Sequence, residues 1–224
     1  MTSRLRWFEL ALVLGIAFGG SLVSALSLAF APATRSDASP NANTISLLVH
    51  EGLALTLLAY VLVRQGRTRA DIGLTFSWMD IPHSLAVAGA SYGAYMIVYV
   101  TVSSLFPESP GSERDVAQLT QMKAAGISLL IGVALLNPFF EELIVRAYAM
   151  TELAALTGSR IVAIAGSVAV QVAYHLYQGP RFAVALGAMF LISSLYYAYV
   201  RRAVPVILAH MYFDAIAVAF SLRA

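Results

Sequence analysis

The stretch NPFFEELIVRAYAM, residues 137–150, carries two adjacent carboxylates and a guanidinium inside a long apolar segment. Glu141, Glu142 and Arg146 fall within six residues of one another. Ionisable side chains are costly inside a bilayer, so they usually face the interior of a helical bundle and have a partner or a function there. The stretch therefore predicts a membrane location and a buried polar site.

The composition of the whole chain agrees with a membrane protein. Of its 224 residues, 59% are hydrophobic and 12% are charged, and the mean hydropathy is +0.77. Ordinary soluble domains have about 25% charged residues. A helix needs roughly 20 residues to cross an apolar bilayer core of about 30 Å. The apolar runs predict an all-α, polytopic membrane bundle of about seven transmembrane helices, at about 8–31, 44–63, 81–105, 124–150, 161–178, 182–200 and 204–222.

One membrane domain, residues 1–224, accounts for the whole chain, because no repeat or second hydrophilic domain is visible. The first apolar run exceeds the 7–15-residue core of a signal peptide and is expected to remain as a helix. With seven spans and the N-terminus inside, the inner side holds most of the arginines: Arg4, Arg6, Arg64, Arg67, Arg69, Arg160, Arg201 and Arg202. The positive-inside rule then predicts a multi-pass cell-membrane protein, in a bacterial inner membrane, with a cytoplasmic N-terminus.

Three connecting segments have a recognisable character. Residues 33–44 and 107–119 are polar and contain proline, so we expect an exposed turn region and an outer-surface loop. Residues 64–80 are basic and then apolar, which predicts a segment resting on the inner headgroups with Trp78 at the interface.

Composition argues against cysteine-dependent chemistry and against nucleic-acid binding. The chain has no cysteine, which excludes disulfides, thiolate catalysis and Cys-ligated metals. The net charge of +2 comes without a basic, aromatic-flanked stripe, so no nucleic-acid partner is expected.

Helical spacing divides the charges of the opening stretch. Residues four apart share a face of a helix, whereas adjacent residues diverge by about 100°. Glu142 can therefore pair with Arg146 while Glu141 points elsewhere and remains available. The simpler alternative is that all three charges only tie helices together.

Two later segments supply further buried polar residues. Glu142 lies sixteen residues before Gly158, and His175 lies sixteen residues after Ser159. In a hairpin folded at this Gly-Ser turn, Glu142 and His175 would be level, roughly 24 Å from the turn. His210 and Asp214 are four residues apart in the last helix and share a face. His210 lies close to the inner turn, so its depth relative to His175 is left open.

These three segments resemble the CPBP family, the membrane CAAX-protease and bacteriocin-processing (Abi) group. The family pattern is E-E-x-x-x-R, then an aromatic-x-x-x-His, then His-x-x-x-Asn/Asp. This chain has Glu141-Glu142-Leu-Ile-Val-Arg146, then Gln171-Val-Ala-Tyr-His175, then His210-Met-Tyr-Phe-Asp214. The resemblance covers about residues 124–218, the expected catalytic core.

The chain also departs from the family pattern. Ala147 stands where a glycine is common and Gln171 where an aromatic is usual, and both changes are expected to affect packing more than chemistry. Asp214 occupies a position that is often asparagine. It can donate to an oxyanion only when protonated, and otherwise it can orient His210.

The resemblance implies a glutamate-driven intramembrane endopeptidase that needs no cofactor or metal. Glu141 with His175 would activate water, and Glu142 with Arg146 would hold the site. His210 with Asp214 would stabilise the oxyanion. The substrate would be a membrane-embedded or membrane-associated protein or peptide: a prenylated C-terminal peptide, a leader of a secreted peptide, or the membrane anchor of an exported protein. The oligomeric state is left open.

Other functions remain open from the residues alone. Two histidines and a glutamate match a common zinc ligand set. However, HEGLA, residues 50–54, has Ala54 where an H-E-x-x-H motif needs its second histidine. His50 and Glu51 are expected near the outer interface, and Ser167 is expected as a helix-packing residue rather than a nucleophile. A non-catalytic scaffold, or a transporter with a buried proton relay, is the remaining alternative.

Overall fold

The computed structural model describes residues 2–30, 39–106 and 125–221. These residues form helices and contain no strand. The elements are α1 (Ser3–Phe30), α2 (Pro40–Arg64), α3 (Asp80–Leu105), α5 (Ile127–Glu141), the π-helix η1 (Glu142–Met150), α6 (Thr151–Thr157), α7 (Arg160–His175), the short 3₁₀ turn η2 (Leu176–Gln178), α8 (Pro180–Val200) and α9 (Val204–Ser221).

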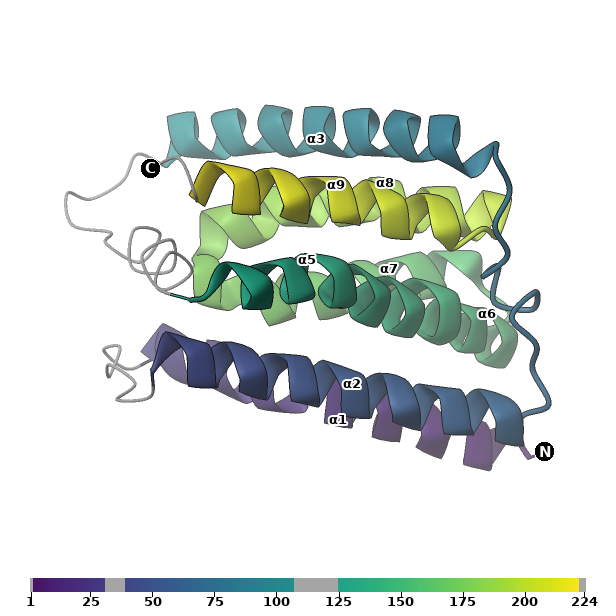
Figure 1. The fold of residues 1–224 in the computed structure, drawn as a ribbon. Helices are drawn as coiled ribbons and strands as arrows, with labels where there is room; N and C mark the ends of the chain where they lie inside the picture. The colour runs from purple at the N-terminus through teal and green to yellow at the C-terminus, as the bar shows by residue number, and fades with distance from the viewer. Residues whose placement is uncertain (1, 31–38, 107–124, 222–224) are drawn as a thin grey trace.

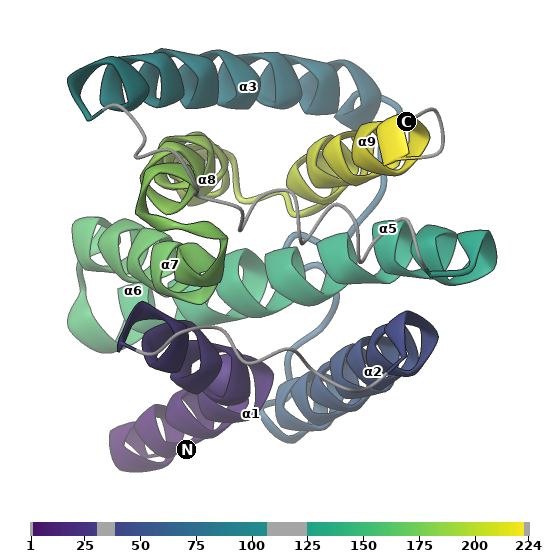
Figure 2. The same cartoon turned by 90° about the vertical axis from the view of Figure 1, so that its left-hand side faces the viewer.

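The helices run back and forth along one axis and stack in layers (Figures 1 and 2). α1 and α2 form one outer layer, and α3 lies along the opposite outer face. α8 and α9 lie beneath α3 and contact it, while α5, α6 and α7 separate them from α1 and α2. The segment that carries the paired glutamates is therefore central.

The predicted all-α membrane bundle is confirmed, with two differences in detail. Within the described ranges, six helices are long and apolar enough to span a membrane, whereas α7 has 16 residues and is shorter than these six. The fourth predicted run does not end at residue 150. It continues through η1 and α6 to Thr157, where Gly158 adopts a left-handed conformation and Ser159 caps α7.

The loop predictions are only partly covered by the structure. Residues 31–38 and 107–124 lie outside the described residues, and they contain most of the two polar segments predicted at 33–44 and 107–119. The end of the first predicted loop belongs instead to α2. The Ser39 side chain accepts a hydrogen bond from the Ala42 N–H, and Pro40 occupies the first turn, where its missing N–H is not needed.

The segment η1 is buried on all sides, and two apolar clusters meet on it. One cluster joins it to α1 and α2 through residues such as Phe18, Leu58 and Val145. The other joins it to α7, α8 and the α8–α9 turn through residues such as Ala147 and Tyr197. A sequence that is hydrophobic nearly all round a helix is expected in such a central position.

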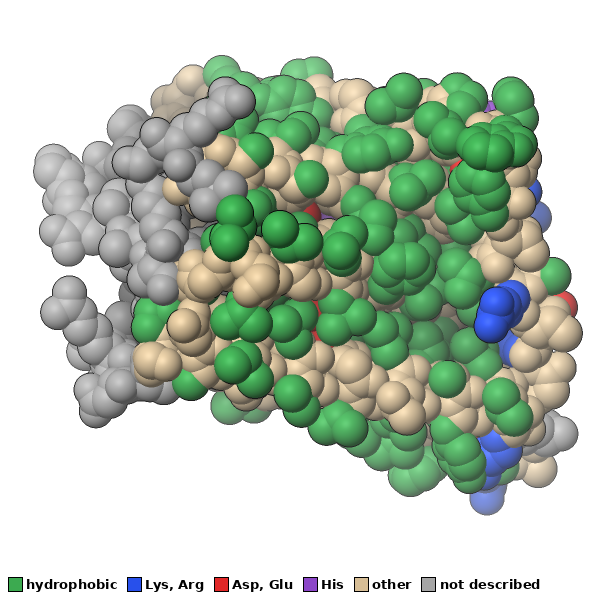
Figure 3. Space-filling view, viewed as in Figure 1, with side chains coloured by type: hydrophobic (Ala, Val, Ile, Leu, Met, Phe, Trp, Pro, Cys, Tyr) green, Lys and Arg blue, Asp and Glu red, His purple; other side chains and the backbone are tan. Residues whose placement is uncertain are grey.

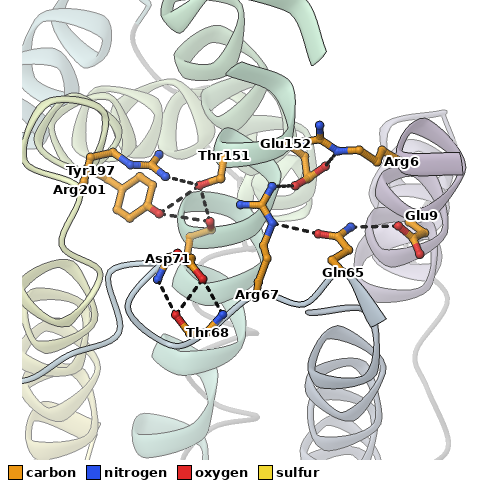
Figure 4. Close-up of polar contacts among 11 residues, drawn as sticks. Arg6, Glu9, Gln65, Arg67, Thr68, Asp71, Thr151, Glu152, Tyr197 and Arg201 are labelled. Carbon is orange, nitrogen blue, oxygen red and sulfur yellow. Dashed lines mark hydrogen bonds and ion pairs between the residues drawn. The ribbon is translucent and has the colours of Figure 1, made fainter. Parts of the chain in front are cut away.

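Ion pairs tie the connecting segment 65–79 to the helix ends beside it (Figure 4). Arg6 of α1 and Arg67 both pair with the fully buried carboxylate of Glu152 in α6, the Arg6 contact being 2.7 Å. Gln65 donates to Glu9 of α1 at 2.9 Å. The buried carboxylates at this end thus have charged or polar partners, as buried charges require.

A tight turn follows in the same segment (Figure 4). The backbone N–H and the hydroxyl of Thr68 donate to the Asp71 carboxylate at 2.6 and 2.7 Å. These bonds favour the ionised form and hold the pKa of Asp71 below its usual range. Trp78, further along, is exposed, in keeping with the predicted interfacial position.

Gly73 fixes the connecting segment against the α8–α9 turn. Its carbonyl accepts a hydrogen bond from the Ala203 N–H at 2.9 Å, and its φ is +70°. A Cβ at this position would lie 2.3 Å from the Arg201 carbonyl oxygen. Only glycine combines this backbone conformation with so close a backbone approach.

We expect Gly73→Ala to destabilise the bundle more than Gly66→Ala, as measured by thermal unfolding in detergent. Gly66 has nearly the same φ, +69°, but nothing lies within 4 Å of its added Cβ. Gly66→Ala should therefore cost only the left-handed strain of about 1–2 kcal/mol. Gly73→Ala adds the clash with Arg201. Equal losses in the two variants would contradict the close approach.

Candidate active site

The two glutamates sit at a junction between helix types. α5 is regular through Glu141, and the i→i+5 geometry of η1 begins at Glu142. Pro138, which cannot donate a backbone hydrogen bond, lies one turn earlier. π-helical turns are rare and often occur at functional sites. Both carboxylates are almost fully buried, with exposed fractions of 1% and 2%.

Glu142 is held by a residue of its own helix and by one from α9. Arg146 Nε lies 3.3 Å from Glu142 Oε2, as the four-residue spacing predicts. His210 Nδ1 lies 3.0 Å from Glu142 Oε1 and donates to it. The open question about the depth of His210 is thereby answered, because the histidine of the last helix reaches the level of the paired glutamates.

Arg146 is a fully buried charge. Its exposed fraction is 0%, and its guanidinium lies over the ring of Phe190, 5.1 Å from the centroid. The contact with Glu142 is within ion-pair distance but lacks hydrogen-bond alignment. Charge neutralisation by Glu142 and a cation–π contact are therefore its two main stabilising interactions within the described residues.

Glu141 points toward a different set of residues. The Gln171 amide of α7 donates to Glu141 Oε2 at 2.9 Å. With its amide nitrogen turned toward the carboxylates, Asn137 donates to Glu141 Oε1 at 3.3 Å and to Glu51 Oε1 at 2.9 Å. Glu141 thus has neutral amide donors, whereas its neighbour Glu142 has cationic or ionisable ones.

His175 lies at the end of α7 with a defined ring orientation. Its Nδ1 lies 2.8 Å from the backbone carbonyl of Gln171. Because a carbonyl only accepts, Nδ1 carries the proton of the neutral ring, and Nε2 is the nitrogen that can take another proton. The ring packs against Tyr174 and Phe190, with centroid distances of 4.6 and 5.0 Å.

His210 and Asp214 share one face of α9. His210 Nε2 lies 3.7 Å from Asp214 Oδ1, which is an ion-pair distance rather than a hydrogen bond. The side chains are 14% and 25% exposed, more than either glutamate of the pair.

A cavity of about 460 Å³ joins these residues. Glu141, His175, His210 and Asp214 line it, whereas Glu142 and Arg146 lie behind its wall. Most of the remaining lining is aliphatic or aromatic, including Leu47, Leu130, Leu186, Met189 and Phe213. A mainly apolar cavity with a few convergent polar groups is the usual form of a ligand site.

Two interpretations from the sequence are wrong. Glu51 is fully buried beside Asn137 and Glu141, and does not lie at the outer interface. Its neighbour His50 contacts the Ala17 carbonyl of α1 at 2.9 Å. Gln171 does more than pack, because it donates directly to Glu141. Its signal was available in the sequence, since it precedes His175 by four residues and shares its face.

Another expectation can be placed in the structure. Ser167 lies in a helix contact, 3.0 Å from Ser194 Oγ of α8, as expected of a small packing residue. In the parts of the chain that the structure describes, no group of three or more His, Asp or Glu side chains is arranged to hold a metal ion.

Comparison with known proteins gives one match. Residues 123–216 match the model of the family described as type II CAAX prenyl endopeptidase Rce1-like. The resemblance to the CAAX-protease group drawn from the three motifs is thereby confirmed. No curated protein and no solved structure matches the chain.

The Rce1-like segment contains every residue of the three motifs, from Glu141 to Asp214. The family match and the apolar helices together indicate a multi-pass membrane enzyme of the CAAX-protease type. α1, α2 and α3 precede the matched segment, so Glu51 comes from a part of the chain that the family model does not cover.

Glu142→Gln is expected to lower the free energy of unfolding by about 3–5 kcal/mol, because Arg146 is left as a buried charge without its anionic partner. The double variant Glu142→Gln with Arg146→Gln removes both charges and should recover part of this loss. Thermal stability in detergent measures both effects. A double variant no more stable than the single one would show that the two side chains do not depend on each other.

Proposed function

We propose that the protein is an intramembrane endopeptidase in which Glu141 and His175 activate a water molecule to hydrolyse a peptide bond. The observation that carries this proposal is the division between the adjacent glutamates. Glu142 is committed to Arg146 and His210, whereas Glu141 faces the cavity with amide partners. A general base must reach the reacting water, and Glu141 is the carboxylate of the pair that lines the cavity.

In the proposed reaction, Glu141 carries a proton from the attacking water to the leaving amine. Glu141 takes a proton from water, whose oxygen bonds to the carbonyl carbon of the substrate. The carbonyl oxygen then becomes an oxyanion. The carbon–nitrogen bond breaks, and the leaving amine receives the proton from Glu141. No covalent bond between enzyme and substrate is needed.

The other motif residues support this sequence of steps. His175 presents Nε2 as its proton-accepting nitrogen and can assist in activating the water. His210 is fixed through Nδ1 by Glu142, and its Nε2 lies on the side of Asp214. His210 and Asp214 are thereby proposed to stabilise the oxyanion, with Glu142 and Arg146 positioning them. Preorganised polar groups of this kind are often the largest contribution to catalysis.

Glu141→Gln should reduce hydrolysis of membrane-anchored peptide substrates by the purified protein at least about 100-fold, the lower range for losing a general base. The substitution is nearly isosteric, so the thermal stability in detergent should change little. Glu9→Gln, the same change at the arginine-rich end of the bundle, serves as the control and should retain activity. Full activity in the Glu141 variant would eliminate the general-base role.

Metal dependence separates this mechanism from the zinc-dependent alternative. Hydrolysis should survive exhaustive dialysis against a chelator, and elemental analysis of the active protein should find far less than one zinc per chain. Stoichiometric zinc that is lost in His175→Ala, together with loss of activity on chelation, would favour the zinc-dependent protease.

A further inference from the structure

The two ends of the bundle differ in charge. The ends of α1, α2, α7 and α8 and the segments that connect them gather most of the basic residues that the structure describes: Arg4, Arg6, Arg64, Arg67, Arg69, Arg160, Arg201 and Arg202. We call this the arginine end, and Figure 3 shows its basic surface on one side of the molecule. At the opposite end, Arg181 is the one described basic residue.

This asymmetry orients the protein in a membrane. Cytoplasmic loops carry the excess of Lys and Arg, and short loops beside the membrane are the ones that count. The connections at the arginine end are short, since α2 and α3 are joined by residues 65–79 and α8 and α9 by 201–203. The arginine end is therefore cytoplasmic, and the opposite end is not.

The cavity extends from the middle of the bundle toward the end opposite the arginines. Its deep wall contains Glu141 and His210, and its outer lining comes from Asn43 in the first turns of α2, Gln178 after α7 and Val218 near the end of α9. No residue of the arginine end lines it. The described lining thus places the cavity in the half of the bundle that faces the non-cytoplasmic side.

The cavity is also suited to a chain that arrives from within the membrane. Acidic surface is visible between α5 and α9 in Figure 3, surrounded by apolar side chains. This agrees with the partial exposure of Asp214 on α9. The mainly apolar lining of the cavity suits an apolar segment of a membrane-embedded chain.

We propose that the substrate is the membrane anchor of a translocated polypeptide, cleaved at a bond in the non-cytoplasmic half of the bilayer. This proposal rests on the proposed endopeptidase function and adds the side and class of the substrate. A prenylated C-terminus of a cytosolic protein would reach the membrane at the arginine end, on the far side from the cavity.

The side of the cavity can be tested without any activity measurement, because the chain has no native cysteine. Asn43→Cys places an exposed thiol at the cavity, and Ala70→Cys places one at the arginine end. In spheroplasts of a bacterial expression host, a membrane-impermeant maleimide should label the Asn43 variant at least tenfold more than the Ala70 variant. Inside-out vesicles should give the reverse. Preferential labelling of the Ala70 variant in spheroplasts would overturn the assignment.

The substrate class needs a second experiment. Two reporters carry the same apolar anchor and the same flanking peptide but have opposite orientations, so that the peptide lies on one side of the membrane or the other. We expect cleavage of the non-cytoplasmic form at least tenfold faster, and its loss with Glu141→Gln. Equal or preferential cleavage of the cytoplasmic form, or of a prenylated peptide, overturns the proposal. Failure of the endopeptidase function would appear separately, as no peptide hydrolysis by the purified protein without substitutions, whereas full activity of Glu141→Gln would eliminate only the general-base role of Glu141.

Discussion

A charge with no exposure to solvent or lipid determines much of this structure. Arg146 lies in a segment buried on all sides, so its guanidinium must be neutralised within the bundle. Glu142 does this from one turn earlier and also binds His210, so the same carboxylate ties the last helix to the centre. Because Glu142 is committed in this way, we assign the proposed general-base role to its neighbour Glu141. The buried charge of Arg146 thus explains why Glu142 has a structural role while the adjacent Glu141 remains available.

The ion pairs that stabilise the helix ends and the cavity lie at opposite ends of the bundle. At the arginine end, the buried carboxylates of Glu9 and Glu152 bind Gln65 and Arg67 of the connecting segment. The Gly73 carbonyl accepts a hydrogen bond from the α8–α9 turn. The cavity lies toward the other end, where its described lining includes Asn43 of α2 and Val218 of α9. The ion pairs of the arginine end and the cavity therefore lie at opposite ends of the bundle. A substitution at one end should have little effect on the contacts at the other end.

The sequence predicts the parts of this arrangement that depend on local spacing. The apolar runs predict the helices, and the four-residue interval predicts the contact of Glu142 with Arg146. Glu142 and His175 are the same number of residues from the Gly158–Ser159 turn, which predicts that α7 packs beside the glutamates. Contacts between distant segments could not be predicted in the same way. Glu51 reaches the site because α2 packs on α5, and no spacing rule connects residues ninety positions apart. The change to π-helical geometry at Glu142 also has no simple periodic signal, since it depends on packing around η1.

The shortness of α7 links the enzyme to the thickness of its membrane. Sixteen residues rise about 24 Å, which is less than the apolar core of about 30 Å. A short element of this kind is accommodated by local thinning of the bilayer. Since His175 ends α7, thinning at this helix would bring headgroups and their water closer to the histidine beside the cavity. For the proposed hydrolysis, lipid chain length would then be a physical variable that sets how readily water reaches the site.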